Sequence, residues 1–210
     1  MRVLYLHGFA SGPDSTKGVA FARHFAERGV ELERINLRVP SFEHLRLSAM
    51  IEKLCGELGD GAILIGSSLG GLAAARVAER DPRVNGLVLL APAFQLAARW
   101  RETLGPAWDA WKTTGWREVI DYTTNAPARV DFGFVEDAAA IDVGFPRVTV
   151  PTLVLHGTRD EVVAIESSRT FVAGCATARL VELDDGHELV ASLPRLLTET
   201  ESFLRALSAV

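Results

Sequence analysis

The chain has 210 residues, of which 48% are hydrophobic and 23% are charged, and its formal net charge at pH 7 is −5. This length is enough for one well-buried core, so we expect a single domain spanning residues 1–210. The acidic balance, without a basic stripe, argues against a nucleic-acid partner. No apolar run approaches the length of a membrane span.

The two cysteines, Cys55 and Cys175, lie far apart and form no CxxC pair. Such cysteine usage fits a reducing compartment and does not indicate a disulfide framework. The first apolar run, residues 3–6, is too short for the apolar segment of a signal peptide. We therefore expect a cytoplasmic protein.

Short apolar runs alternate with helix-forming stretches along most of the chain. They predict strand 3–6, a helix capped by Asp14 or Ser15 and ending near 28, strand 32–37, helix 41–58, strand 62–65, helix 69–80, strand 84–90, strand 152–156, helix 164–172, strand 178–183 and helix 189–207. This alternation is typical of an α/β fold with a mostly parallel sheet, here of about six strands, and helices on both faces. Ligands bind at the carboxyl ends of such strands, so the residues that follow each strand should converge.

The alternation is interrupted between about residues 94 and 150, and this stretch holds all four tryptophans. We interpret it as a cap inserted over the carboxyl ends of the strands. Clustered aromatic side chains suit an acyl or aromatic substrate group, but they would equally form the small core of the cap itself. The candidate substrate-binding residues are Trp100, Trp108, Trp111 and Trp116.

A sharp strand-to-helix turn is predicted at GSSLGG, residues 66–71. A serine nucleophile on such a turn needs small residues two positions before and two positions after it, because strand and helix meet tightly behind it. Ser68 has Gly66 and Gly70 at these offsets, whereas the neighbouring Ser67 would have two large aliphatic residues. Ser68 is therefore the candidate nucleophile.

A serine needs a base within hydrogen-bond reach and a group that orients the base. His187 follows the last predicted strand and is the best candidate base among the five histidines; the two that follow strands directly, His7 and His156, more simply shape loops. The candidate orienting acid is Asp160, after the preceding strand, with Glu161 as its rival. The chain order Ser68, Asp160, His187 is that of an α/β-hydrolase triad.

Two backbone N–H groups are candidates for stabilising an oxyanion. One belongs to Leu69, at the start of the helix after the nucleophile. The other belongs to Phe9, in the loop after the first strand, where Gly8 would let the backbone approach a substrate closely.

On these motifs the whole chain resembles an α/β-hydrolase. More narrowly, HGFASGPDSTK at residues 7–17 and GSSLGG at residues 66–71 resemble the opening and the nucleophile turn of the small bacterial YqiA-type esterases. HGTRDEVV at residues 156–163 is similar to the acyl-thioesterase members of the superfamily. The resemblance implies an α/β-hydrolase fold and an esterase or thioesterase acting on acyl substrates.

The sequence thus predicts a serine hydrolase that cleaves small carboxylic esters through an acyl-enzyme, without a metal or another cofactor. Acyl thioesters are an alternative substrate class on the same triad. A hydrolase fold kept only for ligand binding is an alternative of a different class. Two further alternatives are weaker. The glycines and Lys17 near the N-terminus lack the order of a phosphate-binding loop, and the acidic residues beside His187 have no partner cluster with metal-ligand spacing.

Overall fold

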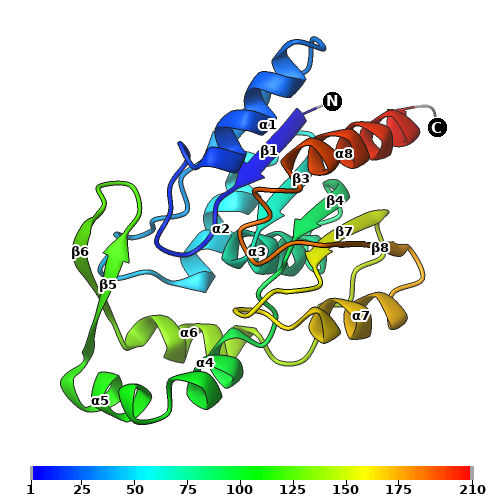
Figure 1. The fold of residues 1–210 in the computed structure, drawn as a ribbon. Helices are drawn as coiled ribbons and strands as arrows, with labels where there is room; N and C mark the ends of the chain where they lie inside the picture. The colour runs from blue at the N-terminus through cyan, green and yellow to red at the C-terminus, as the bar shows by residue number, and fades with distance from the viewer. Residues whose placement is uncertain (1, 209–210) are drawn as a thin grey trace.

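The computed structural model describes residues 2–208. Its centre is a six-stranded sheet in which every neighbouring pair of strands is parallel (Figure 1). The strand order across the sheet is β2 (Leu32–Ile35), β1 (Arg2–Leu6), β3 (Ala62–Ser67), β4 (Val84–Leu90), β7 (Thr152–Gly157) and β8 (Ala178–Leu183). The predicted mostly parallel sheet of about six strands is therefore confirmed.

Helices cover both faces of this sheet. Side chains alternate between the faces along each strand: in β1, Val3 and Tyr5 belong to one core cluster, and Leu4 and Leu6 to the other. The first cluster is completed by α1 (Thr16–Ala26) and α8 (Leu193–Ser208), and the second by α2 (Leu47–Glu57), α3 (Leu69–Ala78) and α7 (Ile165–Ala173). No helix within residues 2–208 is long and apolar enough to cross a membrane.

The insertion between β4 and β7 forms the predicted cap. It contains α4 (Leu96–Leu104), α5 (Pro106–Thr114), an antiparallel hairpin of β5 (Trp116–Asp121) and β6 (Ala126–Asp131), and α6 (Gly133–Ile141) (Figure 1). A buried ion pair between Arg76 of α3 and Asp142 (2.8 Å) fixes the end of α6 to the sheet domain. The hairpin reaches the loop after β1, where the Tyr122 N–H donates to the Ala10 carbonyl (2.9 Å).

Two predicted helix starts are wrong. The helix predicted from residue 41 begins at Leu47. Residues 41–46 are not helical and have a turn at 43–44, and Arg46 is extended (φ −139°) and pairs with Asp131 of the cap. The helix predicted from residue 189 begins at Leu193. Leu189 has a positive φ of 53°, which a right-handed helix does not accept, and Pro194 then lies in the first turn, where proline is tolerated.

Candidate active site

Ser68 lies at the junction of β3 and α3 with φ 52° and ψ −113°, a conformation that side-chain-bearing residues rarely adopt. The glycines on either side are required by close contact. A Cβ on Gly66 would lie 2.4 Å from the Gly70 carbonyl oxygen, and a Cβ on Gly70 would lie 2.3 Å from the Leu6 carbonyl oxygen. The turn therefore holds the Ser68 hydroxyl at the carboxyl edge of the sheet, where it lines a cavity.

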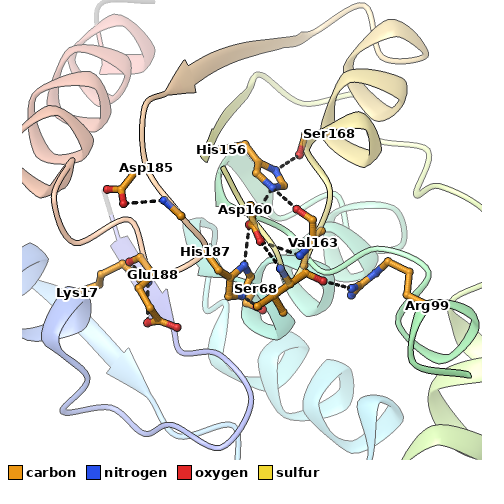
Figure 2. A network of polar contacts seen from close by, with 12 residues as sticks. Lys17, Ser68, Arg99, His156, Asp160, Val163, Ser168, Asp185, His187 and Glu188 are labelled. Atoms are coloured by element: carbon orange, nitrogen blue, oxygen red, sulfur yellow. Dashed lines mark hydrogen bonds and ion pairs between the residues drawn. The ribbon is translucent and has the colours of Figure 1, made fainter. Parts of the chain in front are cut away.

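Ser68, His187 and Asp160 form one hydrogen-bonded chain (Figure 2). The Ser68 Oγ lies 3.0 Å from His187 Nε2, and His187 Nδ1 lies 2.7 Å from Asp160 Oδ2. The Asp160 side chain is fully buried, whereas the His187 side chain is 14% exposed. Since an ionised carboxylate only accepts hydrogen bonds, Nδ1 carries the imidazole proton and Nε2 is free to accept from the serine hydroxyl.

The Asp160 carboxylate is held ionised by its donors. Burial alone would raise its pKa, but hydrogen bonds from His156, from His187 and from the Val163 N–H outweigh burial and hold the pKa of Asp160 well below its usual range. Oδ1 accepts from the Val162 and Val163 N–H groups at 2.8 and 2.7 Å. The rival acid, Glu161, is exposed, and no hydrogen bond or ion pair joins it to His187.

His156 is a member of this network that sequence reasoning assigned only to loop structure. Its buried ring places Nε2 2.8 Å from the Val163 carbonyl and 3.0 Å from Asp160 Oδ2. Both neighbours are acceptors, so Nε2 donates, and Nδ1 accepts from the Ser168 hydroxyl (2.7 Å). The signal in the sequence is the four-residue spacing from His156 to Asp160.

His7, in the matching position after β1, has the structural role that the sequence indicated. Its Nε2 accepts from the Leu37 N–H (2.9 Å), and its Nδ1 lies 2.9 Å from the Gly8 carbonyl. Burial lowers the pKa of His7 and outweighs the Gly8 hydrogen bond, which favours the charged ring. The neutral ring thus connects the loop after β1 to the segment after β2.

The loop that carries His187 is fixed on both sides. Asp185 accepts from the Gly186 and Ser192 N–H groups, each at 2.8 Å. From the opposite side, the buried Lys17 Nζ donates to the Glu188 carbonyl (2.7 Å). Burial lowers the pKa of Lys17, although nearby carboxylates oppose the shift.

The predicted oxyanion donors, the N–H groups of Phe9 and Leu69, lie on two segments next to Ser68, the loop after β1 and the start of α3. A Cβ on Gly8 would lie 3.4 Å from the Ser68 Cβ, so the backbone leading into Phe9 passes directly beside the serine. Leu69 is the first residue of α3, where the N–H groups of a helix have no partner within the helix. Phe9 and Leu69 both line the cavity.

The cavity has a volume of about 580 Å³, which lies within the range of small-molecule sites. Trp100 lines it and packs against Phe9 with ring centroids 5.0 Å apart.

The other three tryptophans of the cap are not among the described residues that line the cavity. Trp111 is buried and donates to the Val130 carbonyl (3.0 Å), Trp108 packs on Trp111, and Trp116 lies under Arg129.

The predicted substrate contact therefore stays with Trp100, and the expectation for Trp108, Trp111 and Trp116 is corrected. Helical spacing places Trp108 and Trp111 on one face of α5, and that face turns inward to the core of the cap. Within the described part of the chain, no group of three or more His, Cys, Asp or Glu side chains is arranged to hold a metal ion.

Comparison with solved structures defines the class of this fold. Est1E from Butyrivibrio proteoclasticus matches with a TM-score of 0.85 and 21% identity, covering 100% of this chain and 90% of that one. Alpha/beta hydrolase domain-containing protein 10 from mouse matches with 0.81 and 19%, covering 98% and 90%. Alpha/beta hydrolase GrgF from Penicillium sp. sh18 matches with 0.78 and 14%, covering 100% and 90%. The protein has the α/β-hydrolase fold.

Within this class, residues 2–204 match the family described as "Uncharacterised protein family (UPF0227)", and the chain belongs to that family. This agrees with the resemblance to YqiA-type proteins seen in the sequence motifs. No curated protein matches the chain significantly.

Proposed function

We propose that this protein is a serine hydrolase that cleaves small carboxylic esters. The observation that carries the proposal is the hydrogen-bonded chain from Ser68 through His187 to Asp160. Its order along the sequence, its place at the carboxyl edge of the sheet and the strained backbone of Ser68 are features of a nucleophile turn.

In the proposed mechanism the Ser68 Oγ attacks the ester carbonyl carbon while its proton moves to His187 Nε2. The N–H groups of Phe9 and Leu69 stabilise the oxyanion of the tetrahedral intermediate. His187 then gives the proton to the leaving oxygen, and the C–O bond of the ester breaks. Water, deprotonated by the same Nε2, attacks the acyl-enzyme and releases the carboxylic acid and free Ser68.

The electrostatics of the acid support this division of roles. Because the pKa of Asp160 is held low, the carboxylate stays ionised through the neutral range and stabilises the imidazolium that forms on His187. An un-ionised acid that donated to His187 Nδ1 would move the imidazole proton to Nε2, which could then no longer accept the proton of the Ser68 hydroxyl.

The cavity supports an acyl substrate with apolar groups. Phe9, Leu96 and Trp100 give it an apolar wall, and Tyr122, Val162 and Val190 line it while remaining largely exposed. Ferulic acid, an aromatic acid, is bound to the fold neighbour Est1E, so feruloyl esters belong among the test substrates. Thioesters are the alternative substrate class on the same residues.

The free thiols of Cys55 and Cys175 support a reducing cytoplasm as the place of action.

The first experiment is labelling with a fluorophosphonate probe, followed by peptide mapping. We expect one adduct on Ser68 that Ser68→Ala abolishes and that Ser67→Ala, the matched control on the adjacent residue, retains. p-Nitrophenyl esters, feruloyl esters and acyl thioesters then define the substrate class through kcat/KM. A folded protein without any adduct contradicts the proposal, and a non-catalytic ligand-binding role would become the better account.

A further inference from the structure

Arg99 of α4 is a cation in the wall of the same cavity that contains Ser68 and His187. Its Nε donates to the Phe94 carbonyl (3.0 Å), and its Nη1 donates to the Val162 carbonyl (2.9 Å). Among residues 2–208, Arg99 has no ion-pair partner, because no carboxylate oxygen lies within 4.0 Å of its guanidinium nitrogens. Burial lowers the pKa of Arg99, opposed only by the more distant Asp142 and Asp160.

This is unusual for the arginines of this chain. Arg76, which is buried, pairs with Asp142 at 2.8 Å, and Arg46, which is partly buried, pairs with Asp131 at 2.7 Å. The other partly buried arginine without a carboxylate partner in the described residues is Arg117, which lies over the rings of Trp100 and Trp111 and is not among the residues that line the cavity. A partly desolvated charge without a counter-ion is costly unless a ligand supplies one.

The guanidinium still has donors to offer. It carries five N–H bonds, and the two carbonyls use one on Nε and one on Nη1. Both N–H bonds of Nη2 and the second of Nη1 have no acceptor among residues 2–208, and this edge matches the paired oxygens of a carboxylate or a phosphate. We propose that Arg99 binds an anionic group, a carboxylate or a phosphate, carried by the substrate; this inference rests on the proposed ester or thioester hydrolysis.

The position of Arg99 suits a group on the reacting molecule. Figure 2 shows Arg99 and Lys17 on opposite sides of Ser68 and His187. Lys17 already donates to the Glu188 carbonyl, which fixes the His187 loop. Arg99 instead donates to the Val162 carbonyl in the loop of Asp160, and it lines the same cavity as Ser68. A substrate that fills this cavity would therefore lie against both residues.

Paired substrates that differ in one anionic group test the inference. The first pair, p-nitrophenyl butyrate and the mono-p-nitrophenyl ester of glutaric acid, places a carboxylate on the acyl side. The second pair, S-butyryl-pantetheine and S-butyryl-4′-phosphopantetheine, places a phosphate on the leaving group. The readout is the ratio of kcat/KM for the charged member to kcat/KM for the neutral member. This ratio is internal to each variant, so partial loss of folded protein cancels.

We expect the wild-type protein to have a higher kcat/KM for the charged member of at least one pair. A preference in the first pair places the anion on the acyl group, and a preference in the second pair places it on the leaving group. Arg99→Gln should reduce that ratio by about 10–100-fold. Arg101→Gln, an exposed arginine on the same helix, is the matched control and should keep it. A ratio that is unchanged in Arg99→Gln, or near unity in both arms of wild type, overturns the inference.

A binding measurement separates this inference from the proposed function. Glutarate and inorganic phosphate are titrated into wild type and Arg99→Gln by calorimetry, which needs no turnover. Binding that Arg99→Gln weakens supports the anion site even if Ser68 proves unreactive toward the fluorophosphonate. A reactive Ser68, together with anion binding that is absent from wild type or equal in the two proteins, overturns the anion site and leaves the hydrolase proposal standing.

Discussion

His156 and His187 contact the same carboxylate oxygen of Asp160, at 3.0 and 2.7 Å. Only His187 reaches Ser68, and the ring of His156 is fully buried behind the acid. His156 thus fixes the acid from the side opposite to the proposed base. Because its ring is fully buried and is not among the described residues that line the cavity, we infer that His156 is a positioning residue.

Removing this support should lower kcat while leaving KM almost unchanged. We expect His156→Ala to reduce kcat by about 10–100-fold, the usual effect of losing a partner that orients a functional group. Steady-state kinetics on a p-nitrophenyl ester give both constants. Ser168→Ala, which removes only the outer hydrogen bond to His156, should cost less. A His156→Ala enzyme with wild-type kcat would show that the two backbone N–H groups suffice to hold Asp160.

The identity of the acid can be tested on adjacent residues. In Asp160→Asn, the amide NH₂ group can replace the oxygen that accepts from His187 Nδ1. An amide that donates to Nδ1 leaves the imidazole proton on Nε2, which faces Ser68, so kcat should fall by about 10⁴-fold. Glu161→Gln is exposed, keeps the shape of the loop and should retain wild-type kcat. Both variants are measured at saturating ester. If Glu161→Gln lost as much activity as Asp160→Asn, the acid would have to be reassigned.

The parts of the fold that follow from local chemistry could be predicted from the sequence. The strands of the large sheet are short apolar runs bounded by turn residues, and the glycines around Ser68 are required by contacts that any such turn makes. The hairpin of β5 and β6 could not be predicted in this way. It contains Pro127 and many exposed positions, and a two-stranded ribbon depends on contacts outside itself, here the pairing of Asp121 with Arg38.

The site shows the same division. Ser68, Asp160 and His187 could be predicted because each follows a strand of a parallel sheet. His7 and His156 stand in the same local sequence, a histidine before a glycine at the end of a strand, yet one bonds the backbone of Leu37 and the other the carboxylate of Asp160. Local sequence cannot distinguish them, because the difference lies in which segment packs beside each ring.

The tryptophans of the cap should separate into a stability class and a substrate class. Trp111→Ala removes a fully buried indole and its hydrogen bond to Val130, so the free energy of unfolding should fall by about 3–5 kcal/mol. Trp100→Ala should instead raise KM for aromatic or long-chain esters. Urea unfolding and ester kinetics on both variants provide the comparison. Trp116→Ala is the control at the hairpin surface. A KM change in Trp116→Ala as large as that in Trp100→Ala would contradict this division.

His7 should make stability depend on pH in a defined direction. The Leu37 N–H donates to Nε2, so protonation of the ring breaks this bond, and burial holds the pKa of His7 below the ordinary value of about 6.5. Below about pH 6.5 the unfolded chain binds a proton that the folded chain excludes, so this contribution is complete above that pH and is lost as pH falls toward the folded pKa. The free energy of unfolding, measured in urea at pH 8, 6.5 and 5.5, should therefore fall more steeply in wild type than in His7→Gln. NMR titration of the His7 ring checks the cause directly, and a midpoint at or above the ordinary value would contradict it.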